Sequence, residues 1–190
     1  MSTTAEMSMR RARLTGLVCL LYLGSIEVLM IAVGRNDAIY TAGAVMANVF
    51  YLVLAVLFYG MFKPVNRWLA LLASGCGVAG CVNNLLQYAS RGAFHIESIA
   101  FLAMFILLTG VLMIRSGFLP PILGWLQVVS GLGWLSTRLP WGRRVVGPHI
   151  SDFDFLVQLL LGLWLLFRGI DLARWNERSH PVAAGLPTEA

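Results

Sequence analysis

Residues Ala42–Phe62 read AGAVMANVFYLVLAVLFYGMF, a run that contains no charged side chain. A helix needs about 20 apolar residues to cross the hydrocarbon core of a bilayer, and this run meets that length. The rest of the chain has the same character, because 58% of its 190 residues are hydrophobic, 12% are charged and the mean hydropathy is +0.78. Soluble domains carry about 25% charged residues. The composition therefore excludes a soluble globular enzyme and a disordered chain.

Six apolar runs are long enough to be spans, and they leave room only for short loops and two short tails. They are Leu14–Val33, Ala42–Phe62, Trp68–Ala89, Glu97–Ile114, Pro121–Ser136 and Phe153–Leu172. The first run is too long for the apolar region of a signal peptide, so we interpret it as a retained span. The sequence predicts an all-α fold, a polytopic membrane bundle of six transmembrane helices in residues 14–175. A cytoplasmic segment, 1–13, precedes the bundle, and a disordered cytoplasmic tail, 176–190, follows it.

The distribution of Lys and Arg predicts that this is a multi-pass protein of the cell membrane with both termini cytoplasmic. In that orientation the inner side holds nine of the 14 basic residues and the outer side holds five. The inner set is Arg10, Arg11, Arg13, Lys63, Arg67, Arg115, Arg168, Arg174 and Arg178, and the outer set is Arg35, Arg91, Arg138, Arg143 and Arg144. Because these residues cluster at the ends of the apolar runs, the net charge of +5 indicates membrane topology and not nucleic-acid binding.

Two acidic residues inside apolar runs, Glu27 and Asp154, are the candidate catalytic residues. An ionised carboxylate costs about 2.5–3.5 kcal/mol at the centre of a membrane helix, so such groups usually face the bundle interior. Two interpretations of Glu27 are open, a functional group or a neutral acid that makes one structural hydrogen bond. Asp154 shares a helix face with Gln158. For its neighbour Asp152 the favoured interpretation is a helix cap, because Ser151–Asp154 resembles a capping box.

Amide, acidic and tyrosine side chains of the other runs are predicted to share a cavity with these acids. The candidate ligand-binding residues are Asn48, Tyr51, Asn83, Asn84, Gln87, Glu97 and Gln158. Under the predicted topology all of them lie in the outer half of the membrane, and a shared wet cavity spares most of the cost of facing lipid separately. Glu97 is also interpretable as ordinary polarity at the membrane interface.

Gly77 and Gly80 are predicted to contact the backbone of a neighbouring helix.

No cofactor and no metal site is predicted. The three cysteines Cys19, Cys76 and Cys81 lie inside apolar runs, where they are interpreted as small packing residues. The expected partners are the lipid bilayer and a lipophilic small molecule, with no nucleic acid. The sequence leaves the oligomeric state open.

Four segments of the chain carry a recognisable pattern. They are Arg11 and Arg13 followed by Thr15-Gly16 and Leu21-Tyr22-Leu23, then Lys63-Pro64-Val65-Asn66-Arg67, then Ile114–Gly124, and finally Leu163–Gly169. Together they resemble a family of bacterial six-helix membrane proteins known as domain of unknown function 4386. The resemblance implies six spans with cytoplasmic termini. It implies no activity and no site residue, and neither Glu27 nor Asp154 belongs to the family's pattern.

Three classes of function fit these observations. The first is a cavity in the outer half of the bundle that binds a lipophilic small molecule. In its sharpest form, Glu27 and Asp154 perform acid–base chemistry on an isoprenoid-like substrate, as a cyclase or isomerase would, because a carboxylic acid shielded from water can donate a proton. The second class is a structural or accessory membrane subunit without catalytic activity. The third is a small transporter, which the absence of internal repeats disfavours.

Overall fold

The computed structural model describes residues 3–32, 37–89 and 98–179, and it describes the side chains of 9–26, 39–87 and 98–177. Every regular element in these ranges is an α-helix, as predicted. The helices are α1 (Thr3–Ala32), α2 (Asp37–Phe62), α3 (Arg67–Ala89), α4 (Ser98–Ser116), α5 (Pro121–Ser136), α6 (Pro140–Val145), α7 (Gly147–Phe167) and α8 (Leu172–Ser179). Each predicted run lies mainly on one of the six longer helices, and the Pro121–Ser136 run coincides with α5. The last run, Phe153–Leu172, was predicted too long, because α7 ends at Phe167 and Leu172 begins α8.

Four of these helices are long and apolar enough to cross a membrane by length and composition: α2, α3, α4 and α7. Their outward faces carry large apolar side chains, such as Val56, Leu72 and Leu160, that are exposed at the surface of the bundle. Soluble proteins rarely expose contiguous apolar surface on this scale. The fold therefore suggests a membrane protein.

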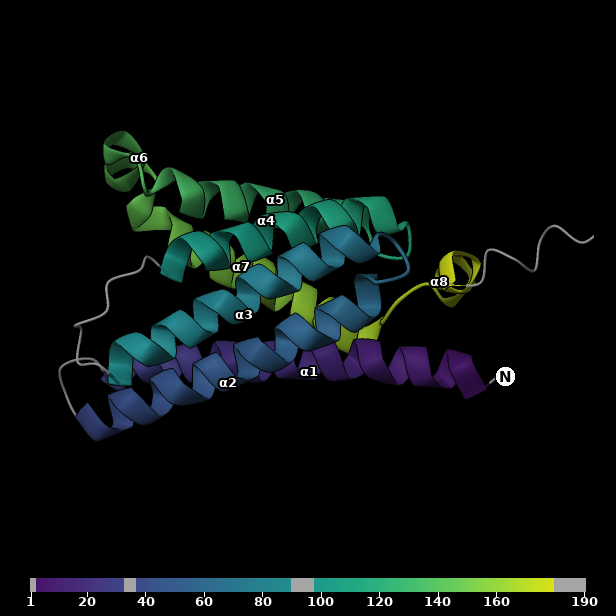
Figure 1. Cartoon of the computed structure of the whole chain (residues 1–190), viewed down its shortest axis with the longest axis horizontal. Helices are drawn as coiled ribbons and strands as arrows, with labels where there is room; N and C mark the ends of the chain where they lie inside the picture. Colours follow the sequence, from purple (N-terminus) through teal and green to yellow (C-terminus); the bar gives the residue numbers. More distant parts are fainter. Residues whose placement is uncertain (1–2, 33–36, 90–97, 180–190) are drawn as a thin grey trace, which may run out of the picture.

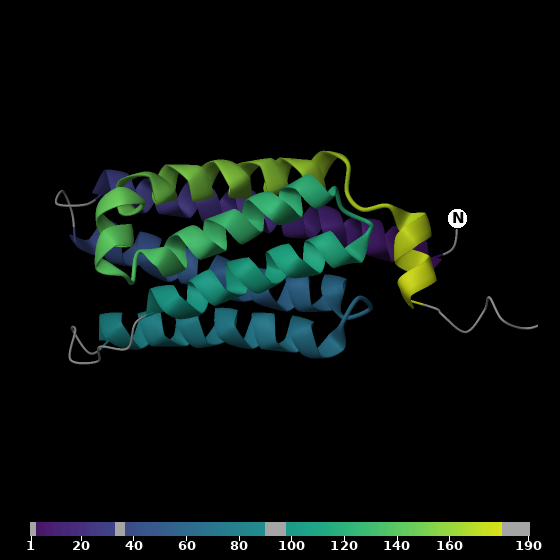
Figure 2. The same cartoon turned by 90° about the horizontal axis from the view of Figure 1, so that it is seen from above.

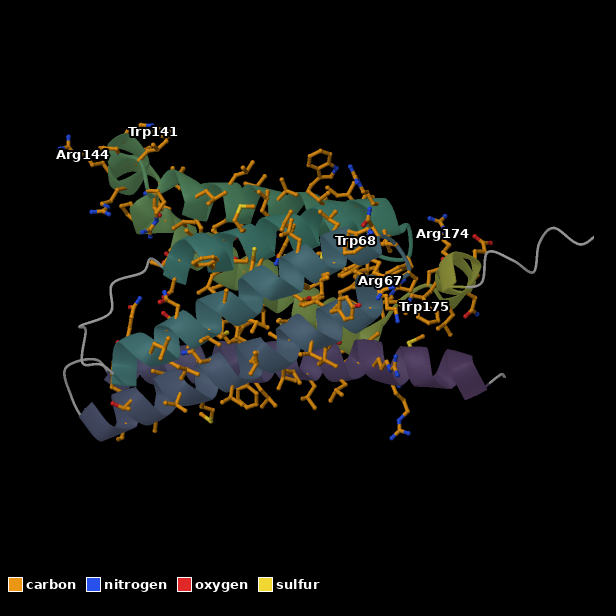
Figure 3. The ribbon with its side chains drawn as sticks, in the orientation of Figure 1. Arg67, Trp68, Trp141, Arg144, Arg174 and Trp175 are labelled. Atoms are coloured by element: carbon orange, nitrogen blue, oxygen red, sulfur yellow. The ribbon has the colours of Figure 1, made fainter. Side chains whose placement is uncertain are left out.

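The six longer helices form a ring in which each packs against its neighbour in the chain, and α7 closes the ring by packing against both α5 and α1 (Figures 1 and 2). Inside the ring, α2 also contacts α4. The short helix α6 lies at one end of the bundle, and α8 lies at the other end, where α1 begins (Figure 1). Basic and aromatic side chains are found at both ends. Trp141 and Arg144 lie on α6, and Trp68 and Arg174 lie near the opposite end (Figure 3).

Glycines let α4 and α5 approach each other at backbone distance. A Cβ atom added to Gly110 would lie 2.7 Å from the backbone nitrogen of Val128 and 2.8 Å from the carbonyl oxygen of Gly124. A Cβ atom added to Gly131 would lie 2.7 Å from the backbone nitrogen of Leu107. Only glycine fits this contact. The two backbones therefore pack directly against each other, without side chains between them.

A second backbone contact joins α1 to α7, where a Cβ atom on Gly16 would lie 2.7 Å from the carbonyl oxygen of Gly162. The prediction for the third helix was only partly right. Gly77 and Gly80 do face neighbouring helices, but their nearest neighbours include side chains of Phe105 and Leu102, and no backbone atom is among them.

Aromatic rings fill the interior between α2 and α4. Consecutive ring pairs lie 5.2–6.0 Å apart, in the order Tyr22, Tyr51, Phe105, Phe58, Phe62 and Phe118. The last of these rings belongs to the loop between α4 and α5, near the end of the bundle that carries α8. Phe62 and the adjacent Met113 are fully buried. This half of the bundle interior is therefore filled by side chains.

Helix α8 is fixed to the loop between α4 and α5. The backbone N–H of Asp171 donates to the carbonyl of Phe118 (3.1 Å), and the guanidinium of Arg174 donates to the carbonyl of Gly117 (2.9 Å). The Asp171 carboxylate accepts the backbone N–H groups of Ala173 and Arg174, so it caps α8. Residues 176–179, which the sequence placed in a disordered tail, are instead the end of this helix, and 180–190 lie outside the described residues.

The start of α7 also differs from the prediction. The helix begins at Gly147, with Pro148 in its first turn, so Ser151–Asp154 lies within the helix and does not cap it. Proline in a first turn costs no hydrogen bond, because the first N–H groups of a helix have no intrahelical partner. The cap interpretation of Asp152 is therefore wrong.

Candidate functional site

A cavity of about 410 Å³ opens in the half of the bundle opposite to α8, between α1, α2, α4, α5 and α7. Ligand pockets typically measure about 300–1,000 Å³. Its walls are mostly apolar or aromatic, and the described residues that line it are Tyr22, Leu23, Ile26, Tyr51, Ile99, Leu102, Ala103, Ile106, Trp134, Ser151, Asp152, Asp154, Phe155 and Gln158. Three of the residues predicted from the sequence, Tyr51, Asp154 and Gln158, are among them.

Asp154 is the central polar group of the cavity. Its Oδ1 atom accepts a hydrogen bond from the hydroxyl of Ser130 (2.5 Å) and a longer one from the side-chain amide of Gln158 (3.5 Å). The indole of Trp134 lies beside the same carboxyl group. Ser130 and Trp134 lie on α5, whereas Gln158 lies one turn along α7, so two helices hold the carboxyl in place. All the donors are uncharged.

Gln158 also meets α1. The thiol of Cys19 donates to the backbone carbonyl of Gln158 (3.5 Å) and lies 4.0 Å from its side-chain oxygen. Both residues are buried. Cys19 is therefore more than a small packing residue, because its thiol makes a polar contact between α1 and α7, close to the Gly16–Gly162 crossing.

Tyr51 lines the cavity from α2 and is only 6% exposed. Its ring packs edge-on against Tyr22 and Phe105, each at a centroid distance of 5.2 Å. Within the described part of the chain, the buried hydroxyl of Tyr51 has no hydrogen-bond partner. A buried polar group without a partner costs about 1–3 kcal/mol, so the position of this hydroxyl in a ligand-sized cavity calls for a partner beyond the described residues.

Gln158 is the one predicted amide among the described lining residues, and the amides of α2 and α3 do not join this cavity. The side chain of Asn48 donates to the carbonyl of Ala44 in its own helix (2.8 Å). Asn83 and Gln87 of α3 both donate to the hydroxyl of Ser98 on α4, at 2.7 and 3.1 Å. These two amides therefore connect α3 to α4. Asn84 is half-buried on α3 and is not among the residues that line the cavity.

Two predicted acids cannot be placed. Glu27 belongs to α1 and directly follows the cavity residue Ile26, but its side chain lies outside the described residues. Glu97 lies outside them altogether. The prediction that Glu27 and Asp154 share one cavity stays a prediction.

Sequence reasoning missed Ser130 and Tyr22 as parts of the site, and it did not single out Trp134 from the other tryptophans. A single serine or tryptophan in an apolar run has no distinctive spacing, and only the packing of α5 on α7 brings Ser130 to Asp154. Tyr22 lies four residues before Ile26 on the same helix face, and this spacing was a usable signal.

The charged residues among the described lining of the cavity are both acidic. Asp154 lies inside the cavity and Asp152 is an exposed residue of its lining, whereas no Lys, Arg or His is among the described lining residues. Within the described ranges, no group of three or more His, Cys, Asp or Glu side chains is arranged to hold a metal ion. The arrangement can bind an apolar molecule and direct one polar group of it toward Tyr51 and Asp154.

No family model, curated protein sequence or solved structure matches this chain. The resemblance to the six-helix family named from the sequence therefore stays an expectation. The site has to be interpreted from its own geometry and chemistry.

Proposed function

We propose that this chain is an integral membrane protein of six spans, which binds a lipophilic small molecule in the cavity around Tyr51 and Asp154. The observation that carries the proposal is the Tyr51 hydroxyl, which is buried in a ligand-sized apolar cavity and finds no hydrogen-bond partner among the described residues. Binding sites of this kind combine apolar walls with a few polar groups that orient the ligand. A hydrogen bond from the ligand would remove the cost of the buried hydroxyl.

The proposal of six spans includes α1 and α5 in addition to the four apolar helices. Leu14, Leu17 and Leu21 form an exposed apolar stripe on α1, and Ile122 and Trp125 begin a similar stripe on α5, where Ile122 is 66% exposed. Stripes of this kind suit contact with lipid. The α5 helix is short for a span, about 24 Å at 1.5 Å per residue, and local thinning of the bilayer accommodates such a mismatch.

The proposed orientation places both termini in the cytoplasm. The beginning of α1 and the docked α8 lie at the same end of the bundle (Figure 1). Arg10, Arg11, Lys63 and Arg67 are exposed on the helix ends and turn that the proposal assigns to this side. The cavity then lies in the outer half of the cell membrane.

Two observations favour binding over the other classes of function. The inner half of the interior is filled by aromatic and aliphatic side chains such as Phe58 and Phe62, which is unlike a conduction path. The Asp154 carboxyl is held by hydrogen bonds from the neutral side chains of Ser130 and Gln158, so it is positioned to orient a polar group of a bound ligand. Acid–base catalysis on an isoprenoid-like molecule is the second candidate, because a carboxyl and a phenol face one cavity.

The proposal is tested by photolabelling the protein in nanodiscs with a diazirine-bearing alkanol. Saturable adducts are expected on peptides that contain Tyr22, Tyr51 or Asp154, and an excess of unlabelled alkanol should suppress them. Ala103 lines the cavity on α4, so Ala103→Phe should fill it and abolish the saturable labelling. Ala42→Phe, on an exposed position of α2, is the matched control. Labelling that survives Ala103→Phe in a protein with unchanged circular dichroism would contradict the proposal.

A further inference from the structure

The lining of the cavity indicates the charge of its ligand. Asp154 and Asp152 are the charged residues among the described lining residues, and both are acids. Ser130 and Gln158 satisfy hydrogen-bonding capacity of the Asp154 carboxyl, but as neutral donors they supply no positive charge. Within the described side chains, no basic residue forms an ion pair with Asp154.

Aromatic rings surround the same acid. Tyr22, Tyr51, Trp134 and Phe155 all line the cavity, together with the carboxyl of Asp154. The face of an aromatic ring is electron-rich and attracts cations, and tyrosine and tryptophan are the rings most used for this purpose. Acid and rings converge from four helices, α1, α2, α5 and α7, so the combination depends on the closed bundle.

We infer that the ligand is a lipophilic organic ammonium compound, whose cationic nitrogen lies against Asp154 among the aromatic rings and whose apolar body lies along Ile99, Leu102 and Ile106 of α4. This inference rests on the proposed function. A neutral ligand of the same shape leaves the acid without a counter-charge in an apolar site, and an anionic ligand is repelled by it.

The unpartnered Tyr51 hydroxyl fits the same ligand. A phenol oxygen has lone pairs that accept an N–H group or face a cationic nitrogen, so it can contribute to the coordination of an ammonium group. Tyr51 is nine-tenths buried and faces the cavity from α2, whereas Asp154 faces it from α7. Two polar groups on different helices thus face one cavity from different sides.

The test compares three ligands of one shape by titration calorimetry on the full chain in zwitterionic nanodiscs, with empty nanodiscs subtracted. The ligands are phenylpropyl-dimethylammonium, which keeps one N–H group, its uncharged isostere with an isopropyl group, and a carboxylate of equal length. We expect saturable binding of the cation, at least about tenfold weaker binding of the isostere, and none of the carboxylate. Asp154→Asn should weaken binding of the cation by about tenfold or more and leave the affinity for the isostere unchanged. Glu177→Gln, which changes the same charge on exposed α8, should have no effect.

The failure of this inference differs from the failure of the proposed function. If the isostere binds the wild-type protein as tightly as the cation, and Ala103→Phe abolishes both, the cavity binds ligands but the assignment of charge is overturned. If neither compound binds saturably, the proposed function is overturned with it. The comparison of cation and isostere uses the wild-type chain, so it stands even where Asp154→Asn does not fold.

Discussion

Replacing Gly110 by alanine is expected to push α4 away from α5. The added Cβ atom would lie 2.7 Å from the backbone nitrogen of Val128 and 2.8 Å from the carbonyl oxygen of Gly124. Ordinary van der Waals contact begins at 3.4 Å, so the helices must separate by about 0.6–0.7 Å at this point. Backbone atoms cannot rotate away as a side chain can. Gly131 makes the same kind of contact one helical turn further along the two helices.

The magnitude follows from two opposing effects. Overpacking of a tight contact costs about 1–3 kcal/mol. Alanine also favours a helix over glycine by about 1 kcal/mol, which partly hides that cost. Gly75→Ala isolates the second effect, because a Cβ atom on Gly75 of α3 has no neighbour within 4 Å among the described atoms. The difference between the two variants is therefore the overpacking cost, about 2–12 °C in melting temperature for a chain of this size.

Thermal unfolding of both variants in one detergent provides the measurement. Gly110→Ala should melt below Gly75→Ala by that interval. The double variant with Gly124→Ala should lose less than the sum of the two single losses, because the first substitution already separates the helices. A Gly110→Ala protein that is stabilised as much as Gly75→Ala would refute the backbone contact between α4 and α5.

Four further outcomes are expected. Tyr51→Phe should leave the ligand-free protein equally stable, or more stable by up to about 1 kcal/mol, while it weakens ligand binding; a clear loss of melting temperature would show that the hydroxyl has a partner within the protein. Gly80→Ala should lower the melting temperature less than Gly110→Ala in the same assay, because the nearest neighbours of Gly80 are side-chain atoms that can move. Cysteine at Arg144 should react with an impermeant thiol reagent applied to whole cells and cysteine at Asn66 should not, and the reverse pattern would invert the proposed topology. Asp171→Ala should remove the cap of α8, worth about 1 kcal/mol, and unchanged amide exchange in α8 would contradict this.

The sequence predicts the helices well because a single physical signal specifies them. An unbroken apolar run such as Ala42–Phe62 has few alternatives to a helix in a membrane, and the proline at position 121 fixes the start of α5. The signals were weaker near the membrane surface. Helix α7 begins at Gly147, four residues before Ser151, with Pro148 in its first turn, and the local capping pattern of Ser151–Asp154 suggested the wrong helix start.

The candidate site was predicted in part because an acid inside the membrane costs free energy unless it faces the interior of the bundle. Asp154 and Gln158 share one helix face, and this placed that face toward the interior. The amides of α2 and α3 misled the prediction, because an amide can be satisfied within its own helix or by a neighbouring helix away from the cavity. Asn48 bonds to a carbonyl one turn back, and Asn83 reaches the hydroxyl of Ser98. Which polar groups share a cavity depends on how distant helices pack, and no periodicity within one helix records that.

The closure of the ring by α7 has a consequence for the synthesis of the protein. Helices α1 to α5 leave the ribosome first, and until α7 follows they contain Ser130 without its acid and Gly16 without its helix partner. The last long helix supplies Asp154 and Gln158, and by packing against both α1 and α5 it closes the ring. A chain that stalls before Gly147 can therefore form an open crescent but not a binding site. Under the proposed function, the ability to bind a ligand then reports that the last long helix has joined the bundle.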